Sequence, residues 1–124
     1  MPTEKLKIHF IGIGGIGVSA LARYYLEKGA KVTGSDLVSS EITDTLREKV
    51  AKLLIGKHGV ENLPKTADLV VYSPAVPANN PELKRAKKLG IKCQSYPEAL
   101  GELTKKYFTI AVSGTHGKLS LIHI

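Results

Sequence analysis

The sequence has little cysteine and few aromatic residues. Cys93 is its only cysteine, which excludes a disulfide within the chain, and we expect it to be a small residue of a strand or of the core. No run of about 18 apolar residues is present, which excludes a membrane-spanning helix. Residues 1–7 are too polar for a secretory signal. These absences predict a cytoplasmic protein with no membrane partner.

The sequence also has few acidic residues, 11 against 18 lysines and arginines, which gives a net charge of +7. The basic residues are scattered, as at residues 84–88, with few aromatic residues between them. Proteins that bind nucleic acid normally show a basic stripe or a recognisable module. We therefore expect a solvated basic surface and no nucleic-acid partner, although such a surface favours the capture of a small, multiply anionic ligand.

Apolar runs and helix-patterned segments alternate along the chain. Asn80 and Pro81 are expected to begin a helix that Gly90 ends, and Ser95 and Glu98 have the spacing of a capping box. The alternation predicts an α/β fold, a Rossmann-like open, mainly parallel sheet with helices on both faces. A single domain is expected to fill residues 1–112. Its strands are predicted at residues 8–11, 31–33, 53–55, 69–72, 91–94 and 108–112.

Three glycines stand between the first predicted strand and the helical pattern that follows it. Gly12 permits the tight turn, Gly14 lets backbone N–H groups approach phosphates, and Gly17 lets the helix pack closely on the strand. A diphosphate would then lie at the positive end of the helix. The spacing alone is a weak signal because the chain has 12 glycines. Its place between strand and helix strengthens it.

Asp36 follows the second predicted strand, 19 residues after Gly17. An acidic residue at about this distance is where the architecture meets the ribose or base of a nucleotide. The alternative is that Asp36 is an ordinary turn residue, since glycine, serine and aspartate at 34–36 are all turn formers. The sequence leaves both interpretations open.

Two prolines stiffen the segment 73–77, which follows the fourth predicted strand. They hold their own φ angles and favour extended conformations at Ser73 and Val76. At the carboxyl end of a strand such a loop could form one wall of a base or sugar site, with Ser73 offering a hydroxyl. A rigid connector without a ligand is the equally good alternative.

A second phosphate signal stands near the end of the chain, at residues 114–118. A lysine behind a glycine turn is how the terminal phosphates of a nucleoside triphosphate are held, but the strict P-loop pattern is not met. Val112 stands where that pattern has glycine, and Leu119 stands where it has the serine or threonine that binds magnesium. We interpret residues 113–124 as the start of a truncated ATP-binding domain with an atypical tail.

These motifs together resemble the Mur ligases of peptidoglycan synthesis. The resemblance runs from about Lys7 to Lys118, and five motifs in the same order are far more specific than any one of them. The segments that carry it are HFIGIGGIG at 9–17, GSDL at 34–37, SPAVP at 73–77, YPE at 96–98 and GTHGK at 114–118.

The resemblance implies an ATP-dependent ligase whose partners are UDP-N-acetylmuramate, L-alanine, ATP and Mg²⁺, and which forms an amide through an acyl phosphate. Its first domain would bind the UDP part of the substrate. No catalytic residue, metal ligand or bound cofactor is expected in this chain alone, which should bind and not catalyse. The resemblance assigns substrate binding to Gly12, Gly14, Gly15, Ile16, Gly17, Asp36, Ser73, Pro74 and Ala75, and ATP binding to Gly114, Thr115, His116, Gly117 and Lys118.

Three alternatives remain at this stage. A related ligase that accepts a muramoyl peptide would bind the same UDP-sugar with this domain. An NAD(P)-dependent oxidoreductase would use the same opening strand, glycine turn and Asp36, but has no need of the glycine–lysine loop at 114–118. A regulatory nucleotide sensor is the third. The oligomeric state is not determined by the sequence.

Overall fold

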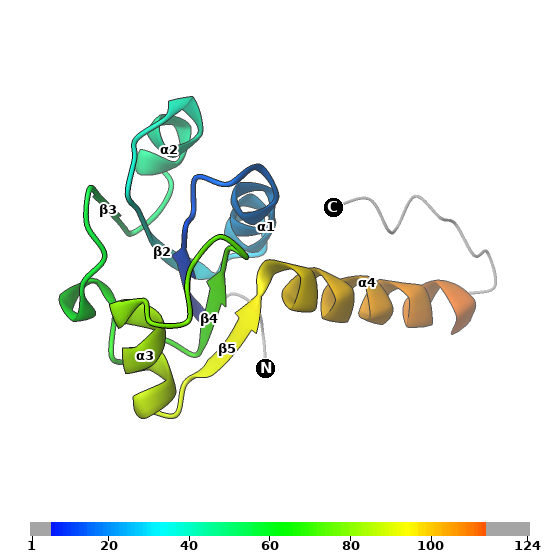
Figure 1. Cartoon of the computed structure of the whole chain (residues 1–124). Helices are drawn as coiled ribbons and strands as arrows, with labels where there is room; N and C mark the ends of the chain where they lie inside the picture. Colours follow the sequence, from blue (N-terminus) through cyan, green and yellow to red (C-terminus); the bar gives the residue numbers. More distant parts are fainter. Residues whose placement is uncertain (1–5, 114–124) are drawn as a thin grey trace.

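The computed structural model describes residues 6–113, with side chains through residue 105. Its core is a five-stranded sheet in the order β3-β2-β1-β4-β5, in which every neighbouring pair is parallel (Figure 1). The predicted α/β fold is therefore confirmed. The strands are β1 (Lys7–Ile11), β2 (Lys31–Asp36), β3 (Lys52–Ile55), β4 (Leu69–Tyr72) and β5 (Lys92–Ser95). The helices are α1 (Ile16–Glu27), α2 (Glu41–Arg47), α3 (Pro81–Lys88) and α4 (Tyr96–Ser113), with a 3-10 turn, η2 (Val60–Asn62).

The two faces of the sheet carry separate apolar cores because side chains alternate along each strand. On one face Ile8, Phe10 and Val32 pack with residues of α1, α2 and α4. On the other face Ile11 and Val70 pack with residues of α3. The helices thus cover both faces, as the alternation of apolar runs predicts. Polar residues of β1 and β2 that point to the α3 face are therefore buried beneath α3, next to the candidate site.

The predicted helix boundaries at residues 80–98 are confirmed. The Asn80 side chain accepts hydrogen bonds from the N–H groups of Glu82 and Leu83, at 2.9 and 3.2 Å. Gly90 ends α3 with a φ of +77°. Ser95 and Glu98 form a reciprocal cap at the start of α4, at 2.8 and 3.3 Å. Local capping rules were sufficient here because each of these contacts spans only a few residues.

The strand predicted at 108–112 is wrong, because α4 continues through this segment to Ser113. Neither glycine nor proline stands at 102–112 to end the helix, so the helix propagates despite several residues that favour strands. Among the described residues the sheet has five strands, not the six predicted. In Figure 1, α4 runs away from the sheet beyond the end of β5.

Asp36 is the last residue of β2, so the interpretation of 34–36 as a turn is also wrong. Gly34 is a buried strand residue, and a Cβ there would overlap the Ile13 side chain. The glycine serves the close packing of Ile13 over the strand. Its turn-forming tendency is overridden by the pairing of β2 with β1 and β3.

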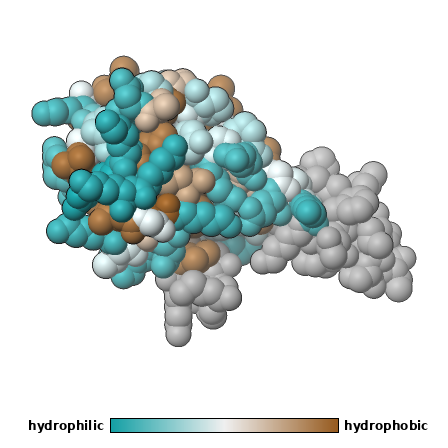
Figure 2. Space-filling model, turned by 60° about the horizontal axis from the view of Figure 1, so that its bottom comes forward, coloured by the Kyte–Doolittle hydropathy of each residue, from teal (hydrophilic) through white to brown (hydrophobic). Residues whose placement is uncertain are grey.

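Polar and apolar residues are mixed over the face of the molecule drawn in Figure 2, where hydrophilic residues cover most of the described surface. None of the described helices is apolar over a span that could traverse a lipid bilayer. Cys93 lies half-buried in β5, where its thiol donates to the Ile91 carbonyl at 3.3 Å and burial raises its pKa.

Candidate functional site

A cleft of about 410 Å³ opens at the carboxyl ends of β1, β2 and β4. Ligands of open α/β sheets bind at this edge, and the volume is in the range of small-molecule sites. The glycine turn, the end of β2 and the proline loop meet here, although the sequence separates them widely. The lining residues are Gly12, Gly14, Gly15, Asp36, Leu37, Val38, Ser40, His58, Ser73, Ala75, Val76 and Pro77.

The glycine turn is held by main-chain hydrogen bonds to β2. The N–H groups of Gly12 and Ile13 both donate to the Ser35 carbonyl, at 2.8 and 3.0 Å. Gly12 has a φ of +79°, a conformation that L side chains rarely adopt, and a Cβ there would lie 2.9 Å from Ser73 Cβ. The turn therefore requires glycine at this position for both its conformation and its contact with the proline loop.

The first turn of α1 presents backbone N–H groups next to the cleft. The helix has no side-chain cap at Gly15, and no acidic residue stands in its first turn. Among the described residues, none accepts a hydrogen bond from the N–H groups of Ile16, Gly17 or Val18. Unpaired N–H groups at a helix N-terminus, together with the helix dipole, favour an anion. Ile16 and Gly17 do not line the cleft itself, and the Ile16 side chain is 82% exposed.

Asp36 is anchored by the glycine turn. Its Oδ2 accepts a hydrogen bond from Gly14 N–H at 2.7 Å, and its Oδ1 accepts one from Leu37 N–H at 2.8 Å. The Gly14 N–H group predicted to approach a phosphate is thus engaged by Asp36, and that of Gly15 donates to the Gly12 carbonyl at 3.1 Å. A carboxylate has about four acceptor sites, so Asp36 keeps capacity for a ligand hydroxyl or N–H.

The proline loop forms one wall of the cleft, with Ser73, Ala75, Val76 and Pro77 in the lining. It is closed by the Val76 N–H group, which donates to the Ser73 carbonyl at 2.9 Å, and by Ala75 N–H, which donates to Ser73 Oγ at 3.2 Å. Pro74 belongs to the same turn but does not line the cleft. The Ser73 hydroxyl is therefore partly committed to its own loop.

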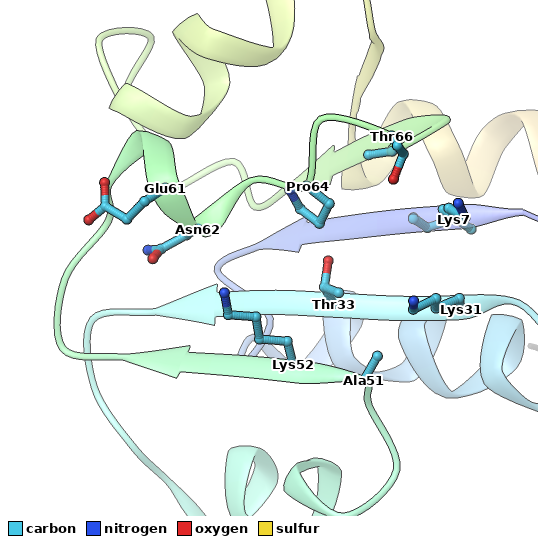
Figure 3. Close-up of a pocket in the computed structure, with 11 residues that line it drawn as sticks. Lys7, Lys31, Thr33, Ala51, Lys52, Glu61, Asn62, Pro64 and Thr66 are labelled. Carbon is cyan, nitrogen blue, oxygen red and sulfur yellow. The ribbon is translucent and has the colours of Figure 1, made fainter.

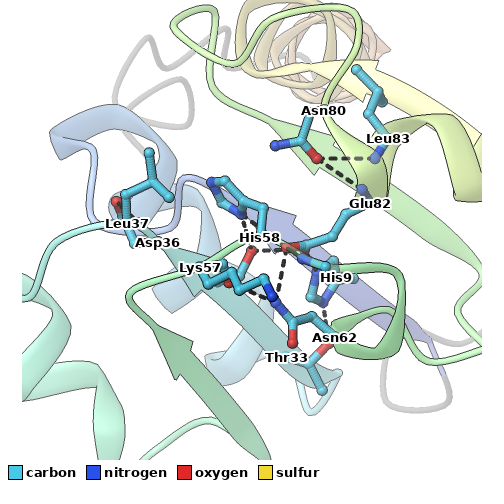
Figure 4. Close-up of polar contacts among 12 residues, drawn as sticks. His9, Thr33, Asp36, Leu37, Lys57, His58, Asn62, Asn80, Glu82 and Leu83 are labelled. Carbon is cyan, nitrogen blue, oxygen red and sulfur yellow. Dashed lines mark hydrogen bonds and ion pairs between the residues drawn. The ribbon is translucent and has the colours of Figure 1, made fainter.

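The sequence interpretation missed His58 and Glu82. Glu82 is fully buried, and its carboxylate accepts from His9 Nε2 at 2.7 Å, Ser35 Oγ at 2.7 Å and His58 Nδ1 at 2.8 Å (Figure 4). Two weaker bonds come from Asn62 Nδ2 at 3.1 Å and Gly59 N–H at 3.3 Å. The signal available in the sequence was His9, a titratable residue within a buried strand that needs a buried partner.

Glu82 is charged at neutral pH despite its burial. Removal from water raises the pKa of a carboxyl group, but the hydrogen bonds from His9, Ser35 and Asn62 outweigh this effect. Together with the charge of His9 they lower the pKa of Glu82 to about 2 from the ordinary 4.5. The network thus places an anionic group directly beneath the cleft, linked to it through His58.

A second cavity, of about 330 Å³, extends along one face of the sheet, from the first residues of β1 and β2 to η2 (Figure 3). It is lined by Lys7, Lys31 and Lys52, the first residues of β1, β2 and β3, and by Glu61 and Asn62 of η2. The cavity thus lies over the face of the sheet, whereas ligands of this architecture bind beyond the carboxyl ends of the strands. None of the motif residues that the structure describes contributes to it.

The model of the Mur ligase family, catalytic domain, matches residues 7–108 of the chain. The chain belongs to the Mur ligase family. Two UDP-N-acetylmuramate–L-alanine ligases are similar over most of it, that of Acetivibrio thermocellus with 52% identity over 94% of the chain and that of Clostridium kluyveri with 54% over 90%. The chain spans only about a quarter of their length, 25% and 24%.

Among solved structures, the UDP-N-acetylmuramate–alanine ligase of Thermotoga maritima is similar to this Mur ligase domain, with a TM-score of 0.76 and 34% identity. The match covers 83% of this chain and 24% of that one. The resemblance inferred from the five motifs is therefore confirmed at the level of the family. The predicted ATP-binding residues Gly114 to Lys118 lie outside the described residues.

Proposed function

We propose that this chain is the substrate-binding N-terminal part of a UDP-N-acetylmuramate–L-alanine ligase and that the cleft binds the UDP part of the substrate. The observation that carries the proposal is the row of unpaired N–H groups at the start of α1, beside a cleft that Asp36 lines. The names of the relatives at 52% and 54% identity supply the substrate.

In this proposal the diphosphate lies at the N-terminus of α1, near Gly15, Ile16 and Gly17, and accepts hydrogen bonds from main-chain N–H groups. Asp36 accepts a hydrogen bond from the uridine, and the proline loop forms the opposite wall. Residues 1–112 form the UDP-sugar-binding domain, and residues 113–124 begin the ATP-binding domain. In the whole enzyme, ATP with Mg²⁺ supplies the phosphoryl group that activates the muramoyl carboxylate for attack by L-alanine.

The proposal is tested by titrating the isotopically labelled chain with UDP-N-acetylmuramate, NADH and ATP in separate NMR experiments. UDP-N-acetylmuramate is expected to shift the amide signals of Gly14 to Gly17 and of Asp36, because its diphosphate and uridine lie against them. NADH and ATP should leave these signals in place. Equal responses to NADH and the uridine sugar would contradict the proposal and favour an oxidoreductase domain.

Asp36→Ala is expected to weaken the binding of UDP-N-acetylmuramate by about 1 to 3 kcal/mol, since it removes a charge-assisted hydrogen bond to the ligand. Isothermal titration calorimetry measures the change. Asp44→Ala is the matched control, because Asp44 is an exposed carboxylate of α2 that does not line the cleft. Equal affinities of the two variants would show that Asp36 only anchors the glycine turn.

A further inference from the structure

The cleft is poor in positive charge for a site that would receive a diphosphate. Among the described residues, its lining contains no lysine and no arginine, and it contains one carboxylate, that of Asp36. Of the described side chains that line it, only His58 can carry a positive charge. Main-chain N–H groups of α1 supply partial charges, but a doubly anionic ligand gains further from a full charge in contact with it.

His58 is held in one orientation by the buried residues Glu82 and Ser35. Its Nδ1 lies 2.8 Å from Glu82 Oε2 and 3.1 Å from Ser35 Oγ. An ionised carboxylate only accepts hydrogen bonds, and the Ser35 hydroxyl proton is donated to Glu82 Oε1 at 2.7 Å. The proton of the His58 ring therefore belongs on Nδ1, which donates to Glu82. This assignment leaves Nε2 as the nitrogen that gains or loses a proton.

His58 Nε2 is directed toward the cleft. The side chain is 12% exposed, whereas that of Glu82 is fully buried. In Figure 4 the second ring nitrogen lies on the side of the ring away from Glu82, toward Asp36 and Leu37. No hydrogen bond to Nε2 is made by any residue of the described part of the chain. The nitrogen is thus available to a ligand in the cleft.

Charged groups lie around His58 on several elements. Glu82 of α3 contacts the ring directly, and His9 of β1 reaches it only through Glu82. Asp36, at the end of β2, lines the same cleft. Lys57 precedes His58 in the chain. The Glu61 carboxylate of η2 packs against Gly59, so that a Cβ added to Gly59 would lie 2.5 Å from the Glu61 Oε1 atom. Anionic groups therefore outnumber cationic ones before a ligand binds.

We propose that His58 contacts the diphosphate of the uridine sugar through Nε2 and takes up a proton there when the ligand binds, with Glu82 as the positioning residue. The inference rests on the proposed function. The proton comes from solvent, joins Nε2, and forms a charge-assisted N–H···O hydrogen bond to a phosphate oxygen, while Nδ1–H remains donated to Glu82. Binding is therefore coupled to protonation, and affinity falls as pH rises.

His58→Gln is expected to lower the affinity for UDP-N-acetylmuramate about 10- to 100-fold at neutral pH, because glutamine cannot carry the charge. The affinity for uridine, which has no phosphate, should change less than threefold in the same variant. Lys57→Gln is the matched control, since it removes a positive charge from the neighbouring residue, which does not line the cleft. Titration calorimetry or NMR at constant ionic strength measures all three.

The proton is detected in the wild-type chain, which avoids any effect of the substitution on folding. Calorimetric titrations with UDP-N-acetylmuramate in buffers of different ionisation enthalpy give the number of protons taken up. We expect net uptake between about pH 6 and 8, where histidines ordinarily change charge, and less of it in His58→Gln. The diphosphate of a UDP-sugar is a diester, so it lacks the phosphate ionisation near pH 6 that would complicate the use of UDP.

The outcomes separate the inference from the function on which it rests. Binding by the wild-type chain with no proton uptake, or with equal affinities of the wild type and His58→Gln, overturns the role of His58 and leaves the proposed function standing. A loss of uridine affinity equal to that of the uridine sugar overturns the contact with the diphosphate. Failure of the wild-type chain to bind the uridine sugar overturns both proposals.

Discussion

Replacing Glu82 with glutamine is expected to lower the free energy of unfolding by about 3 kcal/mol. The buried carboxylate accepts hydrogen bonds from five groups. They belong to β1, to β2, to the loop between β3 and η2, and to η2 itself. Glutamine keeps one acceptor oxygen and turns an NH₂ group toward these donors. Some of them are then buried without a partner. Urea denaturation at pH 7, followed by circular dichroism, measures the loss.

Glu102→Gln is the matched control for this substitution. The Glu102 side chain is 60% exposed and bonds to Lys92 and Gln94 at the surface. Removing its charge should change the free energy of unfolding by less than about 0.5 kcal/mol, as is usual for exposed ion pairs. Equal losses in both variants would contradict the role of the buried network.

The same network determines how stability depends on acid. The pKa of Glu82 is lowered to about 2 in the folded protein, against an ordinary value of 4.5. The unfolded chain therefore binds a proton first as pH falls, so the stabilisation is fully present above about pH 4.5 and is lost toward pH 2. In Glu82→Gln this part of the pH dependence should be much flatter than in the wild type. Parallel curves would show that other carboxylates cause the acid unfolding.

Gly14→Ala is expected to reduce the affinity for the uridine sugar about 30- to 100-fold while the chain remains folded. A Cβ at Gly14 would lie 2.7 Å from Asp36 Oδ2 and 3.0 Å from Thr43 Cγ2. Thr43 is fully buried and cannot move away, so Asp36 must shift and give up its bond to Gly14 N–H. The glycine turn and Asp36 then change where the ligand would lie.

Titration calorimetry measures the affinity of Gly14→Ala, and the amide NMR spectrum shows whether the fold persists. Gly101→Ala is the control for the general effect of replacing a glycine. Gly101 is an exposed residue of α4, and a Cβ there would contact nothing within 4 Å. That variant should bind the ligand as the wild type does and be slightly more stable, by about 0.5 to 1 kcal/mol. Unchanged affinity in Gly14→Ala would contradict the placement of the ligand at the glycine turn.

Several parts of the fold followed from local rules. The start of α1 after the glycine turn, the cap at Asn80 and the end of α3 at Gly90 could be predicted from patterns that span only a few residues. The segment at 108–112 shows where such rules fail. Its composition favours a strand, but a strand forms only where a neighbouring strand offers main-chain partners, and composition does not show whether one is present.

The candidate site was predictable only in part. The glycine turn, Asp36 and the proline loop could be assigned to one edge of the sheet, because the carboxyl ends of parallel strands meet there. The hydrogen bond between Asp36 and Gly14 could not be predicted, since it depends on how closely the glycine turn approaches the end of β2. His58 was missed because nothing around it in the sequence resembles a motif.

The sequence alone was enough to assign the order of strands and helices as far as the start of α4, the position of the phosphate-type turn and the family to which the chain belongs. Periodicity, capping and glycine conformation act over a few residues and can be read along the chain. Only the tertiary structure brought His9, His58 and Glu82 together, because the pairing of His9 with Glu82 spans 73 residues and requires β1 and α3 to pack face to face. Burial of that carboxylate among donors, and with it the charge beneath the cleft, is a property of the assembled layers.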